Sequence, residues 1–163
     1  MSGQRFLACF LVGTLLTVPL SNLGVAQTPK DRLKALADLE HRFTYFEKDF
    51  LDFAAATNDG LEHELALNLN GIAQLIAQRT EAVEILYFLY TNAHCDDDKL
   101  SVSNFLKIMV NEDAESMEVE IRGVDVNLAH TKIPAVSQTA LNMKNEMRSL
   151  KANLEAISAE LRN

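Results

Sequence analysis

Residues 94–98 form the densest cluster of side chains in this sequence that could bind a metal ion. The segment reads His-Cys-Asp-Asp-Asp, and imidazole, thiolate and carboxylate groups are all ligands of Zn²⁺ and related ions. His94, Cys95 and Asp97 are therefore candidate metal ligands. Neighbouring residues rarely converge on one ion without help from elsewhere in the chain, so a solvated turn between helices is the favoured interpretation. In that case Asp98 would cap the helix that follows.

Sequence motifs of known catalytic and cofactor sites fail on spacing. None of the four histidines follows a glutamate by three residues, which excludes the Glu-x-x-His pairs of di-iron bundles. A zincin motif starting at His63 would need a second histidine where Leu67 stands. The sequence also lacks a haem-attachment motif, a phosphate-binding loop and a nucleophile elbow. We therefore expect no cofactor and a non-enzymatic protein, although an active site assembled from dispersed residues leaves no motif.

Residues 1–26 predict a secretory signal peptide. Arg5 is the only charged residue before Lys30, an apolar run follows it from residue 6 to residue 20, and residues 24–26 read Gly-Val-Ala. The run is shorter than the roughly 20 residues that cross a bilayer as a helix. We expect export to the periplasm or the cell exterior, with an uncleaved N-terminal membrane anchor as the alternative.

The remaining chain, residues 27–163, is acidic. The sequence has 23 Asp and Glu residues and 15 Lys and Arg residues, one of which is Arg5, so the cleaved chain carries a net charge of −9. This charge repels phosphate backbones and anionic lipids, which argues against nucleic-acid binding and membrane-surface binding. It favours a basic partner, a cation or simply solubility, and solubility is the default interpretation. Cys95 is the only cysteine left, so no disulfide within the chain can form.

Four long stretches repeat apolar residues every three or four positions, which is the spacing of one helical face. The first begins at Thr28, with Pro29 in the first helical position and Asp31 three residues after the cap. The second ends near residue 92, and the third covers about residues 99–130. Residues 117–122 also alternate like a strand, but a helix is favoured because a lone short strand has no sheet to join.

The fourth stretch runs from Ile133 to Leu161 and has the unbroken repeat of a coiled coil. Pro134 marks the start of its helix. Four stretches of about 30 residues with short connections predict an all-α, antiparallel, up-down-up-down four-helix bundle. We expect residues 27–163 to form this single domain.

The first stretch carries four phenylalanines on one face, which suit a bundle core but would also suit a groove for a ligand or partner. They are Phe43, Phe46, Phe50 and Phe53. Counting residues from the predicted turns brings Gly71 and Gly123 to the level of Phe46. We predict that Phe46 fills the space left by the two missing side chains. The alternative is a mid-bundle pocket for an apolar ligand, because glycine inside a helix costs about 1 kcal/mol relative to alanine.

Arg79 stands where the second stripe expects an apolar residue. A buried guanidinium needs a charged partner, and the same counting brings Glu40 and Asp113 close to it. We predict an ion pair with at least one of these acids. The alternative is that Arg79 lies at the edge of the core and reaches water.

The charges of the last stretch allow self-association. In a parallel dimer Glu146 of one copy would meet Lys151 of the other, which is the pairing that coiled coils prefer. The same apolar stripe is needed to cover the other three helices of one chain, so we expect a monomer. A weak dimer through this helix or through Cys95 is the alternative.

These patterns favour one function. We expect an exported, non-enzymatic bundle that acts through protein–protein contact, as an adaptor, an inhibitor or a chaperone-like protein. The alternative is a bundle that binds a small apolar ligand or a metal.

Overall fold

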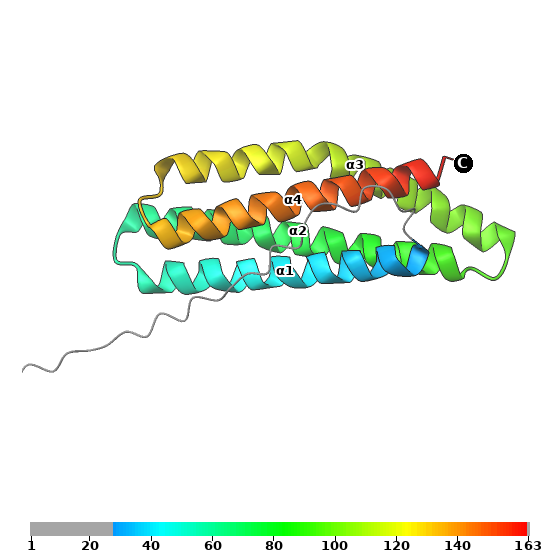
Figure 1. Ribbon diagram of the computed structural model, residues 1–163, viewed down its shortest axis with the longest axis horizontal. Coiled ribbons are helices and arrows are strands. Elements are labelled where there is room, and N and C mark those ends of the chain that lie inside the picture. The colour runs from blue at the N-terminus through cyan, green and yellow to red at the C-terminus, as the bar shows by residue number, and fades with distance from the viewer. Residues whose placement is uncertain (1–27, 163) are drawn as a thin grey trace, which may run out of the picture.

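The computed structural model describes residues 28–162, and the predicted signal peptide lies outside the described residues. The described chain consists of four long helices: α1 (Pro29–Ala56), α2 (Gly60–Asn92), α3 (Asp96–His130) and α4 (Pro134–Glu160). Each helix runs antiparallel to the one before it (Figure 1). α1 and α3 each pack against α2 and α4 and lie across the diagonal of the bundle. The predicted up-down-up-down four-helix bundle is confirmed, and residues 117–122 belong to α3.

Side-chain caps fix where the first three helices begin, and α4 begins at Pro134 without one. The Thr28 hydroxyl accepts a hydrogen bond from the Asp31 backbone N–H, and the Asp31 carboxylate accepts one from the Thr28 N–H, both at 3.2 Å. This is the predicted start of the first helix. The Asp59 carboxylate caps α2 by accepting hydrogen bonds from the backbone N–H groups of Leu61 and Glu62. The prediction that Asp98 caps α3 is wrong, because the cap is Cys95, whose Sγ accepts from the Asp98 N–H at 3.4 Å.

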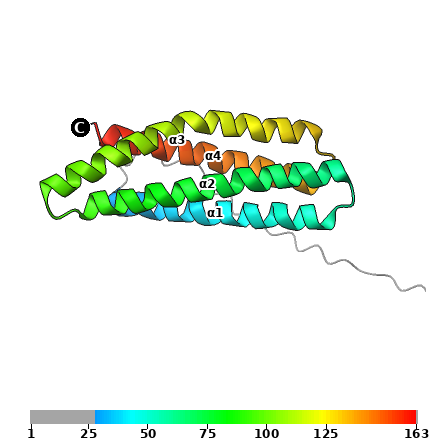
Figure 2. The same ribbon diagram turned by 180° about the vertical axis from the view of Figure 1, so that it is seen from behind.

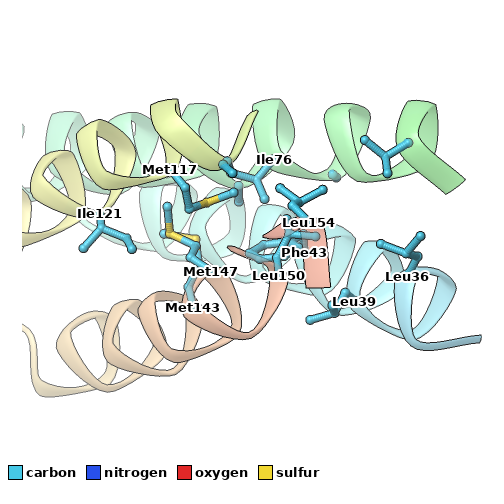
Figure 3. Close-up of a cluster of buried hydrophobic side chains, with 14 of the residues drawn as sticks. Leu36, Leu39, Phe43, Ile76, Met117, Ile121, Met143, Met147, Leu150 and Leu154 are labelled. Carbon is cyan, nitrogen blue, oxygen red and sulfur yellow. The ribbon is translucent and has the colours of Figure 1, made fainter. Parts of the chain in front are cut away.

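The core is made by the predicted apolar stripes. Met117 of α3 meets Met143 and Met147 of α4 in the middle of the bundle, as Figure 3 shows. Phe43 and Phe50 have no exposed surface, whereas Phe46 and Phe53 are partly buried against the core. The phenylalanine face of α1 therefore packs inside the bundle.

The four helices are not of equal length. α1 and α4 have 28 and 27 residues, whereas α2 and α3 have 33 and 35. At 1.5 Å per residue, the difference between α3 and α4 is roughly 12 Å. The α2–α3 hairpin therefore extends beyond the start of α1 and the end of α4 (Figures 1 and 2). The tip of this hairpin is not covered by the other two helices.

The two ends of the bundle are held by polar clamps. At the α1–α2 turn, the buried Glu62 accepts hydrogen bonds from the Thr131 hydroxyl and the Lys132 backbone N–H, both at 2.6 Å. At the other end, Glu160 of α4 accepts a hydrogen bond from the Tyr87 hydroxyl at 3.0 Å and lies 3.5 Å from Arg32. The first clamp fastens the α3–α4 connection to α2, and the second joins the last turn of α4 to α2 and to the first turn of α1.

Candidate functional site

Large apolar side chains gather on the outer surface of the projecting α2–α3 hairpin. They are Ile85, Phe88 and Leu89 of α2 and Leu100, Phe105 and Ile108 of α3. Their exposed fractions range from 47% for Leu89 to 68% for Phe105. Single exposed apolar residues are normal on any protein, but a gathering of them is not. This surface is the strongest candidate for a functional site on the described residues.

The sequence of α2 explains this exposure. Residues 82–90 are apolar except for Glu84, and a helix turns by about 100° per residue, so its apolar side chains point in all directions. Val83 and Tyr87 reach the core, while Ile85 and Leu89 face solvent. A helix that is apolar all round is normally covered on every side. In this bundle the outer side of α2 is left uncovered.

Two grooves border the outer face of α2. The α2–α3 groove has a volume of about 560 Å³ and an apolar lining formed by Leu75, Ala82, Leu86, Phe105, Ile108 and Met109. The α1–α2 groove has a volume of about 360 Å³ and is lined by Leu33, Lys34, Ala37, Glu84, Ile85, Phe88 and Leu89. Together they form one apolar surface that spans the outside of α2.

Arg79 forms the polar floor of the α2–α3 groove. Its Nε lies 3.6 Å from Oδ1 of Asp113, and its Nη1 donates a hydrogen bond to the Ser116 hydroxyl at 2.8 Å. Nη1 also lies 4.0 Å from a carboxylate oxygen of Glu120. The predicted ion pair with Asp113 is present, and the Arg79 side chain is also 32% exposed, so it reaches water as well.

Glu40 takes no part in this network. Its carboxylate accepts a hydrogen bond from Thr44 on α1, at 3.0 Å. Ser116 and Glu120, which the sequence reasoning missed, follow Asp113 by three and seven residues and so share its helical face. That spacing was the signal that could have identified them.

Carboxylates stand on both sides of the apolar surface. Partial burial raises the pKa of Glu84, and the neighbouring charges of Glu40 and Glu81 raise it further. Burial also raises the pKa of Asp113, against the opposing effect of Arg79 and with a further contribution from Glu112. At Glu84 and at Asp113, burial and neighbouring acids therefore disfavour the negatively charged form of the carboxyl group.

The predicted metal ligands are not brought together. His94 and Cys95 are exposed beside the α2–α3 turn, and Asp97 lies in the first turn of α3. Within residues 28–162, no three His, Cys, Asp or Glu side chains lie close enough to share a metal ion.

The glycines do not form the predicted arrangement with Phe46. A side chain at Gly71 would meet open space, and Gly71 lies on the exposed side of α2. A Cβ at Gly123 would lie 3.3 Å from the Ile72 side chain, and Phe46 is not among the residues within 4 Å of it. The prediction that Phe46 fills this space is wrong. The predicted height along the bundle is right, since the Ile72 side chain lies beside Gly123. Gly71, however, faces solvent rather than α3.

The charges of α4 are paired within the chain. Lys151 bonds Glu118 of α3, Lys144 bonds Asp125 of α3, and Glu146 accepts a hydrogen bond from Arg42 of α1 at 2.8 Å. Two of the charges that a parallel dimer would use, those of Glu146 and Lys151, therefore already have partners. No helix of the described chain combines the length and apolar character needed to cross a membrane.

Comparison with known proteins adds no assignment: no protein-family model, curated protein or solved structure matches this chain. The case for a function therefore depends on the surface formed by α2 and α3.

Proposed function

We propose that this protein is exported and acts, without catalysing a reaction, by binding another protein through the apolar outer surface of α2 and α3. The observation that carries the proposal is the exposure of Ile85, Phe88, Leu89, Phe105 and Ile108 on one projecting hairpin. Exposed apolar side chains contribute little to folding stability. Contiguous apolar patches on soluble proteins typically mark surfaces for association.

The polar groups of the grooves support binding rather than catalysis. Arg79 is engaged by Asp113 and Ser116, and the Ser116 hydroxyl donates to the Asp113 carbonyl oxygen at 3.1 Å. Serine needs an adjacent base to act as a nucleophile, whereas the Ser116 hydroxyl donates to a backbone carbonyl oxygen and no histidine lines either groove. The grooves therefore offer anchoring surface and fixed charge.

Site-specific crosslinking in the native compartment tests this function. A photoreactive amino acid replaces Phe88 or Phe105 in one pair of variants, and Tyr45 or Leu51 in a control pair. Tyr45 and Leu51 are 57% and 52% exposed on α1, outside both grooves. We expect the first pair to give one discrete protein adduct and the control pair to give none. Identical adduct patterns from both pairs, or no adduct from Phe88 and Phe105, would contradict the proposal.

A further inference from the structure

The apolar surface has acidic groups on both long sides. On the α1 side, Glu84 lines the α1–α2 groove, and the charges of Glu40 and Glu81 act on it. On the α3 side, Glu112 and Asp113 line the α2–α3 groove. The surface is therefore an apolar band between two acidic borders.

The acids that line the two grooves outnumber the cations by three to two. Lys34 is the only cation in the lining of the α1–α2 groove, and Arg79 the only one in that of the α2–α3 groove. Arg79 is already held by Asp113 and Glu120. Lys99 lies over the Tyr90 ring, 5.2 Å from its centre. Lys107 follows Phe105 by two residues, about 200° around the helix from it, and so points away from that groove.

This charge distribution opposes pairing with a second copy. A two-fold symmetric contact brings the same surface of both copies together. Because both borders of the band are acidic, either border would meet an acidic border of the other copy. Like charges placed across an interface weaken association. The band therefore suits a partner whose charge is opposite to its own.

The groove has the form of a helix-binding site. Leu75, Ala82 and Leu86 lie along α2 at spacings of seven and four residues, which places them on one face over roughly 16 Å. Phe105, Ile108 and Met109 form the opposite wall on α3. A partner helix lying between the walls would bury apolar residues spaced by three, four and seven positions.

Building on the function proposed above, we infer that the partner segment is an amphipathic helix whose apolar face is flanked by lysine or arginine residues. Its apolar face lies along the α2–α3 groove, and its basic flank faces the carboxylate of Glu112 on the α3 wall. The charged borders would set the orientation and speed of binding, while the apolar groove would supply most of the affinity.

Direct binding of designed peptides tests this inference. The probe is a fluorescently labelled helix-forming peptide of leucine, alanine and lysine, with leucines on one face and lysines beside it. A second peptide replaces every lysine with glutamine. Fluorescence anisotropy measures the affinity of each peptide for the protein at low and at high salt. We expect the lysine peptide to bind more tightly, with an affinity that falls as salt increases.

Matched variants locate the binding. The double variant Phe105→Ser/Ile108→Ser should weaken binding of the lysine peptide by about tenfold or more. Glu112→Gln should weaken it by about twofold. The controls Tyr45→Ser/Leu51→Ser and Asp38→Asn/Glu155→Gln change exposed residues outside both grooves and should leave the affinity unchanged. Because all these positions are at least partly exposed, each variant should keep the thermal stability of the parent protein.

Three outcomes would overturn the inference. Equal affinity for both peptides, with no effect of Glu112→Gln, would exclude a basic helix, yet the function itself would stand if crosslinking through Phe105 succeeded. Weakening by the control variants as much as by the groove variants would indicate non-specific charge attraction. Failure to bind either peptide would exclude a simple helical ligand, and failure of the Phe105 crosslink as well would also exclude the proposed function.

Discussion

The guanidinium Nε of Arg79 on α2 lies 3.6 Å from the carboxylate Oδ1 of Asp113 on α3. The pair joins the two helices at the floor of the α2–α3 groove, one flank of which is open to solvent. Asp113 is the more buried partner, with 13% of its side chain exposed against 32% for Arg79. The ion pair therefore holds the charges of Arg79 and Asp113 at the groove, where Arg79 still contacts solvent.

Replacing Asp113 with asparagine should raise the thermal stability of the protein at neutral pH. Burial outweighs Arg79 and raises the pKa of Asp113 in the folded state. A raised carboxyl pKa contributes stability that is complete below the unfolded value of 3.8 and is lost as the pH rises through the folded value. The advantage of Asp113→Asn should therefore shrink as the pH falls toward 3.8. Thermal melts across this range check it, and a lower melting temperature for the variant at pH 7 would show that the ion pair dominates.

Tyr87→Phe should destabilise the bundle by about 1–2 kcal/mol at neutral pH, because the buried hydroxyl donates to the Glu160 carboxylate. Burial, followed by the charge and hydrogen bond of Glu160, raises the pKa of Tyr87 to about 12. The neutral phenol therefore stabilises the fold fully below pH 10.0, and this contribution is lost as the pH rises toward about 12. Urea unfolding at pH 8 and at pH 11 should show the two proteins converging. A constant difference between them would contradict the assignment.

Glu62→Ala should cost about 2–3 kcal/mol of unfolding free energy. The change leaves the Lys132 backbone N–H and the Thr131 hydroxyl without their acceptor in a partly buried place. Glu62→Gln keeps an acceptor oxygen and should lose less. Hydrogen exchange provides the local measurement, since the Lys132 amide should lose protection in the alanine variant. A loss of stability below about 0.5 kcal/mol would mean that water replaces the clamp.

The bundle should sediment as a monomer at micromolar concentration with or without reductant. Its fourth helix buries its apolar face internally, and Glu146 and Lys151 pair with α1 and α3. Replacing Leu150 and Leu154 with serine should therefore unfold the protein rather than dissociate a dimer. A reductant-insensitive dimer that these changes convert to a folded monomer would refute this account. Exposed Cys95 should add only a disulfide-linked dimer that Cys95→Ser abolishes.

The sequence predicts most of the fold because each helix carries one apolar face and clear end signals. The Thr28–Asp31 cap and the Arg79–Asp113 pair also follow from spacing alone. The candidate site was missed for a geometric reason. The apolar stripe of α2 includes Val83, Leu86 and Tyr90. It passes over Ile85, Phe88 and Leu89, which lie on the outer side of α2 that no other helix covers. The run at residues 82–90, which is apolar except for Glu84, is the signal that indicates this surface.

Gly71 illustrates the same limit. Counting residues from a turn gives the height of a residue in an antiparallel bundle, and that height was correct for Gly71 and Gly123. It does not give the direction in which a residue faces, which depends on its rotation around the helix axis. The four phenylalanines of α1 were harder to assign for a related reason, since core and groove residues share one spacing.

Native mass spectrometry of the protein recovered from its own compartment tests the central claim most directly. The comparison is between the parent protein, the variant Phe88→Ser/Phe105→Ser and the control Tyr45→Ser/Leu51→Ser, all four positions being more than half exposed. We predict that the parent and the control carry the same bound protein and that the groove variant, with an unchanged melting temperature, appears as the free chain. A complex that persists in the groove variant, or a small-molecule mass in place of a protein, would contradict the account.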